Sequence, residues 1–182
     1  FPKPVSLLSY LISIGSTNSD DIVLDFFSGA ATSAHAVIQI NSQDGGKRKF
    51  IMVQLPEASD QNAEAYKAGY KTIADIGKER IRRVIKKIGA EQEEKKKKGD
   101  GELFEQKDSG DEKLDLGFKV FKLDASNIST WDPDFDNVQQ DLLSAVDNIK
   151  TDRTEEDVLY EILLKYGLDL AVPIELRKIA GK

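Results

Sequence analysis

The chain has 182 residues, 40% hydrophobic and 32% charged, which is enough for one domain with a substantial core but too few for a second full domain. It has no cysteine, which excludes disulfide frameworks and cysteine nucleophiles, and a single histidine, His35, which argues against the common histidine triads and against histidine-rich metal centres. A net charge of −6 argues against a dedicated nucleic-acid-binding domain, for which a basic balance is typical.

The first third of the chain has the pattern of a parallel α/β unit. Apolar residues at helical spacing predict a helix over 4–15, and the next apolar run predicts a strand over 22–27. An alanine-rich helix over 31–42 follows, and the almost continuously apolar segment 50–55 predicts a second, buried strand. Strand, helix and strand within about thirty residues form a βαβ unit, so we expect the two strands to be parallel.

A long amphipathic helix is predicted next, over 72–88. Six basic residues lie between Lys78 and Lys87 and cover much of its polar side. Such a face is more often solvated surface than a nucleic-acid site. The charged segment 89–115 lacks apolar anchors, so we expect a mobile loop or a frayed helix end there.

The last part of the chain, 116–182, is expected to complete the same domain as the βαβ core in 1–88. Alternating apolar and charged residues predict an edge strand, exposed on one face, over 116–123. A helix is predicted over 135–149. A final helix is expected to be capped by Thr154 with Asp157 and to stop at Gly167.

The stretch "DFFSGAATSAHAV", residues 25–37, joins the first strand to its helix. A turn of this kind is where α/β folds commonly hold charged small molecules. Its single glycine, Gly29, does not supply the Gly-x-Gly-x-x-Gly pattern of dinucleotide binders, and no Gly-Lys-Ser/Thr phosphate loop follows. Asp25 suits an ammonium group and the helix N-terminus suits a carboxylate, and S-adenosylmethionine carries both. A strand-ending aspartate is also frequently only structural.

The neighbouring segments make this signal more specific, because in order and spacing they resemble the cofactor half of amino-methyltransferases that act on DNA. The segments are "FPKPVSLL" (1–8), "VLDFFSGAATSAHAV" (23–37) and "KRKFIMVQLPE" (47–57). Three further segments narrow the resemblance to the modification subunits of type III restriction-modification systems. These are "TIADIGKERIRR" (72–83), "GFKVFKLDASN" (117–127) and "DVLYEILLKYGLDLAVPIE" (157–175).

The resemblance implies a fold and a biological context. The fold would be α/β, a partial Rossmann-like S-adenosylmethionine-dependent methyltransferase fold with additional C-terminal helices. The parent protein would be a cytoplasmic DNA adenine-N6 methyltransferase. It would act on double-stranded DNA, form a homodimer, join the restriction subunit of its system and have no membrane association.

The resemblance also implies which residues border S-adenosylmethionine. Lys3 and Pro4 would lie at its methionine end and Asp25 would face its ammonium group. The remaining cofactor residues implied at the turn and after the second strand are Phe27, Ser28, Gly29, Ala31, Gln54 and Glu57. No metal site is expected, and His35 is given no chemical role.

Two positions depart from the family pattern. Ala31 replaces a common second glycine, which is tolerable if its φ is negative but limits how tightly the backbone can wrap a ligand. Gln54 stands where an acid usually accepts both ribose hydroxyls, and the acid Glu57 comes three residues later. The role of Gln54 is open between ribose recognition and a strand-end amide bonded to a neighbouring loop.

The family's catalytic motif, Asp, Asn or Ser followed by Pro-Pro and an aromatic residue, is absent from the sequence. The string Asp132-Pro133-Asp134-Phe135 lacks the second proline and is interpreted as turn or helix-start chemistry. We therefore expect the catalytic and target-recognition parts upstream of Phe1, and no activity from this chain alone. Two alternatives stay open: a Rossmann-like domain for another adenine nucleotide, and an interaction scaffold with a degenerate pocket.

Overall fold

The computed structural model describes residues 3–16, 18–99, 114–129, 136, 138–139, 148–175 and 177. It divides into two compact units, residues 1–117 and residues 118–182. The string Asp132-Pro133-Asp134-Phe135 and most of the helix predicted over 135–149 lie outside the described residues. Each unit is described by itself below.

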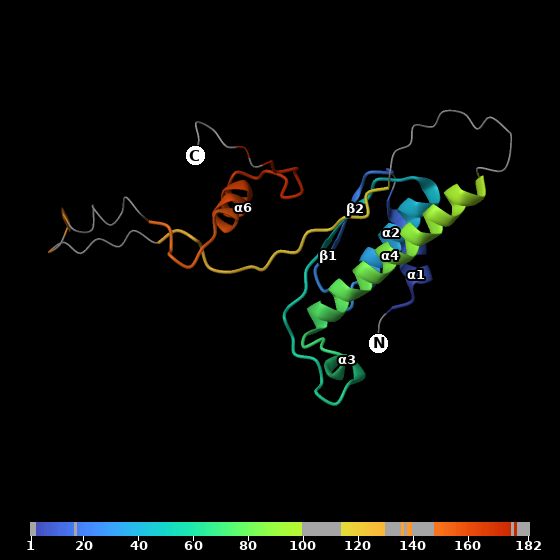
Figure 1. The fold of residues 1–182 in the computed structure, drawn as a ribbon, viewed down its shortest axis with the longest axis horizontal. Helices are drawn as coiled ribbons and strands as arrows, with labels where there is room; N and C mark the ends of the chain where they lie inside the picture. The colour runs from blue at the N-terminus through green and yellow to red at the C-terminus, as the bar shows by residue number, and fades with distance from the viewer. Residues whose placement is uncertain are drawn as a thin grey trace. The chain divides into compact units, whose positions relative to one another are not determined.

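The first unit contains the predicted parallel βαβ arrangement (Figure 1). Strand β1 (Ile22–Asp25) and strand β2 (Lys49–Met52) pair in parallel, with Leu24 opposite Ile51. Helix α2 (Thr32–Asp44) connects them. Both strands are shorter than predicted, but the ladder extends past their ends, because Val53 N–H donates to the Asp25 carbonyl at 2.9 Å.

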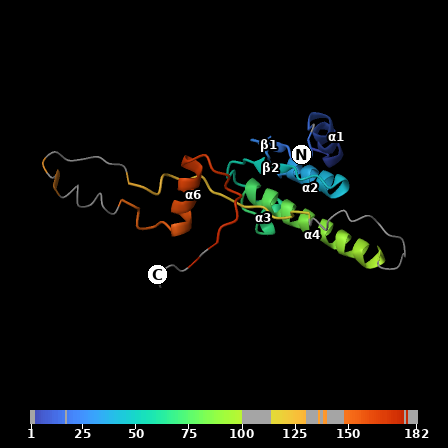
Figure 2. The ribbon, with the colours of Figure 1, turned by 90° about the horizontal axis from the view of Figure 1, so that it is seen from above.

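Helix α2 lies between α1 (Val5–Gly15) and α4 (Ile73–Gly99), and it contacts both (Figure 2). Its side chains form the core of the unit, because Ala34, Val37 and Ile38 are almost fully buried. The residues of α4 that are buried with them are Ile81, Val84 and Ile88. The unit is thus a small parallel sheet with helices packed on one another around α2.

Specific polar contacts fix the C-terminal end of α2 to the segment that enters β2. Gly45 ends the helix with a left-handed φ of 71°, and its N–H donates to the Asn41 carbonyl at 2.9 Å. The buried Asn41 then bonds the backbone of Arg48 through both ends of its amide, at 2.8 and 3.2 Å. These bonds hold the connection that enters β2, so the two strands are fixed in register by the helix between them.

Helix α4 differs from the prediction at its end, because it continues from the predicted limit near residue 88 to Gly99. A short helix that was not predicted, α3 (Glu64–Lys67), precedes it. The start of α4 is capped reciprocally: Asp75 N–H donates to the Thr72 hydroxyl oxygen, and Thr72 N–H donates to the Asp75 carboxylate.

The second unit is built around α6 (Glu155–Lys165), whose start is the predicted capping box of Thr154 and Asp157. Gly167 follows it with a left-handed φ of 68°, as expected of a helix stop. The Glu161 carboxylate binds the segment before it, accepting from Ser126 Oγ at 2.5 Å and Asn127 N at 2.7 Å. The structure differs from the predicted strand over 116–123, because these residues form no strand with any of the residues that it describes.

Candidate functional site

The turn after β1 gathers five of the residues predicted to border a ligand. The Ser28 N–H donates to the Val53 carbonyl at 3.1 Å, which carries the parallel ladder beyond Asp25. The Ala31 N–H then donates to the Ser28 carbonyl at 2.7 Å and closes the turn, and α2 starts at Thr32. The first turn of α2 contains no acidic residue. The Ser33 hydroxyl in this first turn bonds the Asp25 carboxylate, so the N-terminus of α2 lies close to Asp25. The N–H groups and the positive dipole end of the helix favour an anionic ligand group there.

The Asp25 carboxylate is half-buried and oriented by two donors. Its Oδ1 accepts from the Phe27 N–H at 3.2 Å, and its Oδ2 accepts from the Ser33 hydroxyl at 2.5 Å. A carboxylate has about four acceptor positions, so these two bonds leave capacity for a cationic ligand group. The sequence analysis did not single out Ser33. Its position could have indicated this contact, because it places a hydroxyl in the first helical turn after an aspartate that ends a strand.

Two residues of the turn have a left-handed backbone, Gly29 with a φ of 51° and Ala31 with a φ of 55°. The condition set for Ala31, a negative φ, is therefore not met. Among the described residues Ala31 is the one non-glycine with positive φ, and the left-handed region costs such a residue roughly 1–2 kcal/mol. The turn thus keeps the shape that two glycines would give, at a cost in backbone strain.

Gln54 reaches across from the end of β2 to this turn. Its Oε1 accepts from the Gly29 N–H at 2.7 Å and its Nε2 donates to the Leu55 carbonyl at 3.2 Å. Of the two roles left open for Gln54, the structure shows the amide bonded to a neighbouring loop. Glu57 has an exposed side chain, and its carbonyl accepts from the Ile73 N–H at 2.9 Å, so its backbone anchors the start of α4.

The predicted residues Lys3 and Pro4 lie at the start of α1, where both are exposed. Pro4 is the N-cap residue and its carbonyl accepts from the Leu8 N–H at 3.3 Å. Within the described part of the chain, no hydrogen bond or ion pair joins either residue to the Asp25 turn. Their assignment to the cofactor therefore stays a prediction.

Gly77 in α4 packs against the turn and was missed by the sequence analysis. A Cβ at this position would lie 3.2 Å from the Gly29 carbonyl oxygen and 3.4 Å from the Ala31 Cβ. A Cβ contact of 3.2 Å is tighter than usual packing, so an alanine at this position would require the helix or the turn to shift by a few tenths of an ångström. The signal in the sequence was a lone glycine inside an otherwise regular helical pattern.

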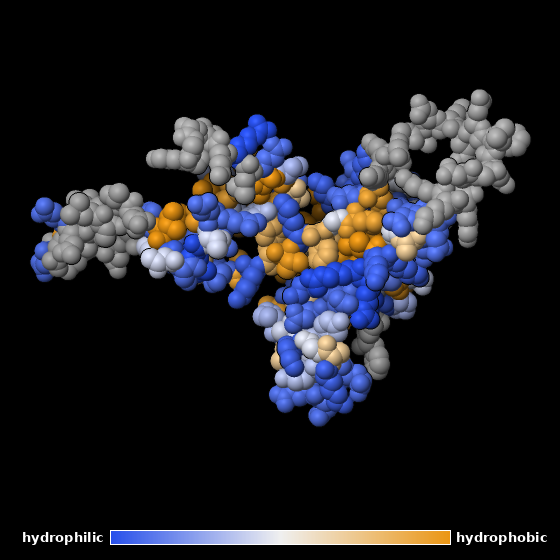
Figure 3. Space-filling model, in the orientation of Figure 1, coloured by the Kyte–Doolittle hydropathy of each residue, from blue (hydrophilic) through white to orange (hydrophobic). Residues whose placement is uncertain are grey.

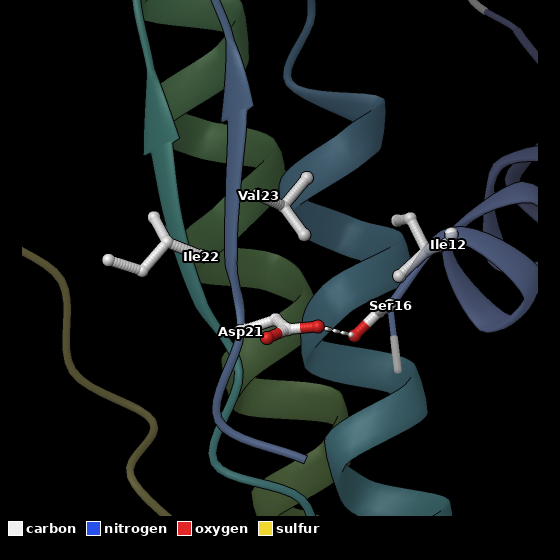
Figure 4. Close-up of a pocket in the computed structure, with 6 residues that line it drawn as sticks. Ile12, Ser16, Asp21, Ile22 and Val23 are labelled. Atoms are coloured by element: carbon white, nitrogen blue, oxygen red, sulfur yellow. Dashed lines mark hydrogen bonds between the residues drawn. The ribbon is translucent and has the colours of Figure 1, made fainter. Parts of the chain in front are cut away.

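A hollow with a volume of about 320 Å³ lies at the end of β1 opposite to Asp25 (Figure 4). Ile12 and Val23 point into it from α1 and β1, and the Asp21 carboxylate accepts from the Ser16 hydroxyl at 3.1 Å. Its residues are apolar or already bonded to one another. The chemistry that could hold a charged ligand is at the Asp25 end, so we place the candidate site there.

His35, on α2, lies close to the basic side chains of α4. Burial lowers the pKa of His35 below its usual value, and the positive charges of Arg80 and Lys87 lower this pKa further. Its ring is therefore neutral near neutral pH. In the parts of the chain that the structure describes, no group of three or more His, Asp or Glu side chains could hold a metal ion.

A parallel βαβ unit with an acid and a left-handed turn at the carboxyl end of its first strand defines a class of α/β proteins that bind small charged ligands. Comparison with known families is more specific. Residues 1–99 match the family described as DNA methylase. The chain belongs to this family.

Individual relatives agree with the family. The chain is 48% identical over 89 residues to the type III restriction-modification enzyme StyLTI Mod subunit of Salmonella typhimurium, covering 49% of this chain and 14% of that protein. It is 46% identical over 86 residues to the EcoPI Mod subunit of Escherichia phage P1, covering 47% and 13%. It is also 41% identical over 71 residues to the type II methyltransferase M.KpnI of Klebsiella pneumoniae, covering 38% and 17%. The chain thus spans about a seventh of the Mod subunits that it matches.

The searched helices of the structure give no candidate for a membrane span. None of those in the described residues combines sufficient length with sufficient apolar character to cross a bilayer.

Proposed function

We propose that this chain forms the S-adenosylmethionine-binding part of a site-specific DNA adenine-N6 methyltransferase, the modification subunit of a type III restriction-modification system. The observation that carries the proposal is the turn from Asp25 to Ala31, in which an oriented carboxylate, two left-handed residues and a helix N-terminus converge. Family membership and the similarity to Mod subunits support it. The fold would be a partial Rossmann-like methyltransferase fold.

The residues present fit this cofactor. The half-buried Asp25 can accept from the ammonium group, and the N–H groups at the start of α2 can donate to the carboxylate. Phe27 is 78% exposed at the turn, which leaves its ring free to stack on an adenine face. S-adenosylmethionine supplies an electrophilic methyl group on its sulfonium; the task of this chain is to bind and orient it.

Transfer to DNA needs groups that this sequence does not contain. The enzymes of this kind hold the flipped base by a Pro-Pro motif with an aromatic residue, and no Pro-Pro pair occurs here. We therefore propose that another part of the polypeptide presents the base. The rate enhancement would come chiefly from holding the two reactants close together and in line. By itself the chain would be inactive.

The partners in this proposal are double-stranded DNA, the restriction subunit and a second copy of the modification subunit. The exposed side of α4 is a candidate contact, because six basic residues and one acid lie between Lys78 and Lys87 in a chain whose net charge is −6. Figure 3 shows hydrophilic side chains along one side of this helix. A DNA methyltransferase acts where the DNA is, so a cytoplasmic location belongs to the same proposal.

A scaffold with a degenerate pocket is the second candidate, because Ala31 and Gln54 both depart from the family pattern. The two candidates differ in what the full-length protein does to DNA. With S-adenosylmethionine and duplex DNA, the proposal predicts N6-methyladenine detectable by mass spectrometry of the digested product. An Asp25→Ala variant should lose at least tenfold in kcat/KM for the cofactor, a factor that corresponds to about 1.4 kcal/mol. A full-length protein that folds but leaves the DNA unmethylated would support the scaffold.

A further inference from the structure

The turn from Ser28 to Ala31 is contacted from two sides, by one residue that the resemblance places at the cofactor and by one that the sequence did not single out. The Gln54 amide bonds it from the end of β2, and Gly77 packs against it from α4. We propose that Gln54 and Gly77 are positioning residues, which hold the turn in its left-handed conformation before a ligand binds. This inference rests on the proposed function, because the turn is taken to be the cofactor-binding backbone.

Gln54 has the chemistry of a holding group. Its Oε1 lies 2.7 Å from the Gly29 nitrogen, a short bond in a half-buried environment, and its Nε2 is used by the Leu55 carbonyl at 3.2 Å. The amide oxygen of Gln54 has two lone pairs, and the Gly29 N–H occupies one of them. We therefore infer that Gln54 acts on the ligand chiefly through Gly29, and that an acceptor such as Glu57 binds the ribose.

Gly77 contacts the turn from α4. Glycine inside a helix costs about 1 kcal/mol relative to alanine. At position 77 it coincides with a close approach to the turn backbone, since an added Cβ would lie 3.2 Å from the Gly29 carbonyl oxygen and 3.6 Å from the Ala31 nitrogen. A backbone oxygen in a closed turn cannot move aside as a flexible side chain would. A methyl group at position 77 would therefore displace the turn, the helix or both.

Together the two contacts explain how Ala31 keeps a strained conformation. A non-glycine residue remains left-handed only where the surrounding structure holds it there. The turn is bonded through Gly29 on one side and contacted by Gly77 on the other, so the backbone that leads into α2 already has its left-handed conformation before a ligand binds. Preorganisation of this kind lowers the cost of ordering a loop on binding.

The first experiment measures the dissociation constant of S-adenosylhomocysteine for the full-length protein by calorimetry. Gly77→Ala is compared with Gly89→Ala, a matched control in the same helix, where the added Cβ would make an ordinary 3.8 Å contact with Leu116 Cδ1. We expect Gly77→Ala to weaken binding about tenfold and Gly89→Ala to leave it unchanged. Adding Ala31→Gly to Gly77→Ala should restore part of the affinity, because it removes the Ala31 Cβ and relaxes the turn. Equal affinities for the two single variants would overturn the role of Gly77.

The second experiment separates holding the turn from binding the ribose. Gln54→Leu removes the acceptor at similar volume, and Gln54→Glu keeps an acceptor for the Gly29 N–H. We expect about a tenfold loss for Gln54→Leu and most of the affinity kept for Gln54→Glu. The loss should be the same for S-adenosylhomocysteine and for its 2′-deoxyribose analogue. A loss that disappears with the deoxy analogue would make Gln54 a ribose ligand and overturn the proposal.

A ligand-independent measurement keeps this inference distinct from the proposed function. Hydrogen exchange of the Gly29 amide should accelerate in Gln54→Leu and Gly77→Ala but not in Gly89→Ala. If the wild-type protein bound no S-adenosylhomocysteine, the proposed function would fail, while faster exchange in both variants would still support their hold on the turn. Unchanged Gly29 exchange in both variants would overturn that hold.

Discussion

At the scale of single residues, Ala31 offers the most direct test of backbone strain. Its φ of 55° belongs to the left-handed region, which glycine adopts without strain. Ala31→Gly should therefore raise the free energy of unfolding by about 0.5–1 kcal/mol, as relief of left-handed strain outweighs the greater freedom of glycine in the unfolded chain. Urea denaturation would measure it.

The control for this prediction is Ala34→Gly, three residues further on and fully buried inside α2. The same chemical change there should lower the free energy of unfolding by about 1 kcal/mol or more, because glycine is unfavourable within a helix and leaves a small void. Equal losses of stability in the two variants would show that Ala31 is not strained.

His35 gives a pH-dependent prediction. It is the single histidine of the chain, so its ring proton signals can be followed by NMR without assignment. Its pKa is lowered by burial and by the charges of Arg80 and Lys87, so the unfolded chain binds the proton more readily than the folded one. Stability should therefore fall as the pH drops from about 6.5 through the lowered pKa. Arg80→Gln should raise the pKa of His35, because it removes one of the two positive charges that lower it. Lys67→Gln is the control and should leave this pKa unchanged, because Lys67 is not one of the charges that lower it.

At the scale of elements, the start of α4 depends on the reciprocal bonds of Thr72 and Asp75. Hydrogen bonds from Lys78 and Thr72 lower the pKa of Asp75 to about 2. A carboxylate with a depressed pKa stabilises the fold above its unfolded pKa, about 3.9, and loses that effect as the pH falls toward 2. In Asp75→Asn, the free energy of unfolding should therefore depend less on pH between about 3.9 and 2. Unfolding followed by circular dichroism would measure this. An unchanged acid profile would contradict it.

The sequence predicted most elements of the first unit, and the misses have physical causes. Helix α4 extends past residue 88 because Glu and Lys are strong helix formers and pair along the helix, as Lys87 and Glu91 do at 3.9 Å. The absence of apolar anchors was interpreted as a mobile loop or a frayed helix end, and residues 89–99 are helical. Residues 118–123 have the alternation of a strand, but a strand needs a partner, and the sequence pattern does not say whether one is present.

The candidate site was predicted in part. Asp25, Ser28, Gly29 and Gln54 are brought together because they follow two adjacent parallel strands, and the carboxyl ends of such strands meet at one edge. The left-handed φ of Ala31 was not predictable, since an alanine normally avoids it. Gly77 was missed because its partner is a backbone oxygen far away in sequence.

At the scale of the whole molecule, one face of the sheet is apolar and exposed. Leu24 is 59% exposed and pairs with Ile51, which is 50% exposed. Figure 4 shows Val23 pointing toward α1 and Ile22 pointing to the other side of the strand. Exposed apolar patches of this kind are rare on isolated domains. We expect the remainder of a Mod-like polypeptide to cover this face.

This expectation predicts different effects of neighbouring substitutions. In the 182-residue chain, Leu24→Thr should change the free energy of unfolding by less than about 0.5 kcal/mol, whereas Val23→Thr should lower it by about 1 kcal/mol. In the full-length protein, Leu24→Thr should become as costly as Val23→Thr, because the face would be buried. Thermal unfolding of both variants in both proteins would measure this. If Leu24→Thr did not change the stability of the full-length protein, the face would be exposed there too, which would contradict the expectation.

The central claim is that the turn from Asp25 to Ala31 binds S-adenosylmethionine, and calorimetric titration of the full-length protein with this cofactor tests it most directly. Asp25→Ala is compared with Asp44→Ala, which removes a carboxylate at the other end of α2, where Asp44 pairs with Arg48 at 2.8 Å. The account predicts saturable binding by the wild type and Asp44→Ala, and a loss of at least tenfold in Asp25→Ala. Equal binding by all three proteins would place the cofactor elsewhere and contradict it.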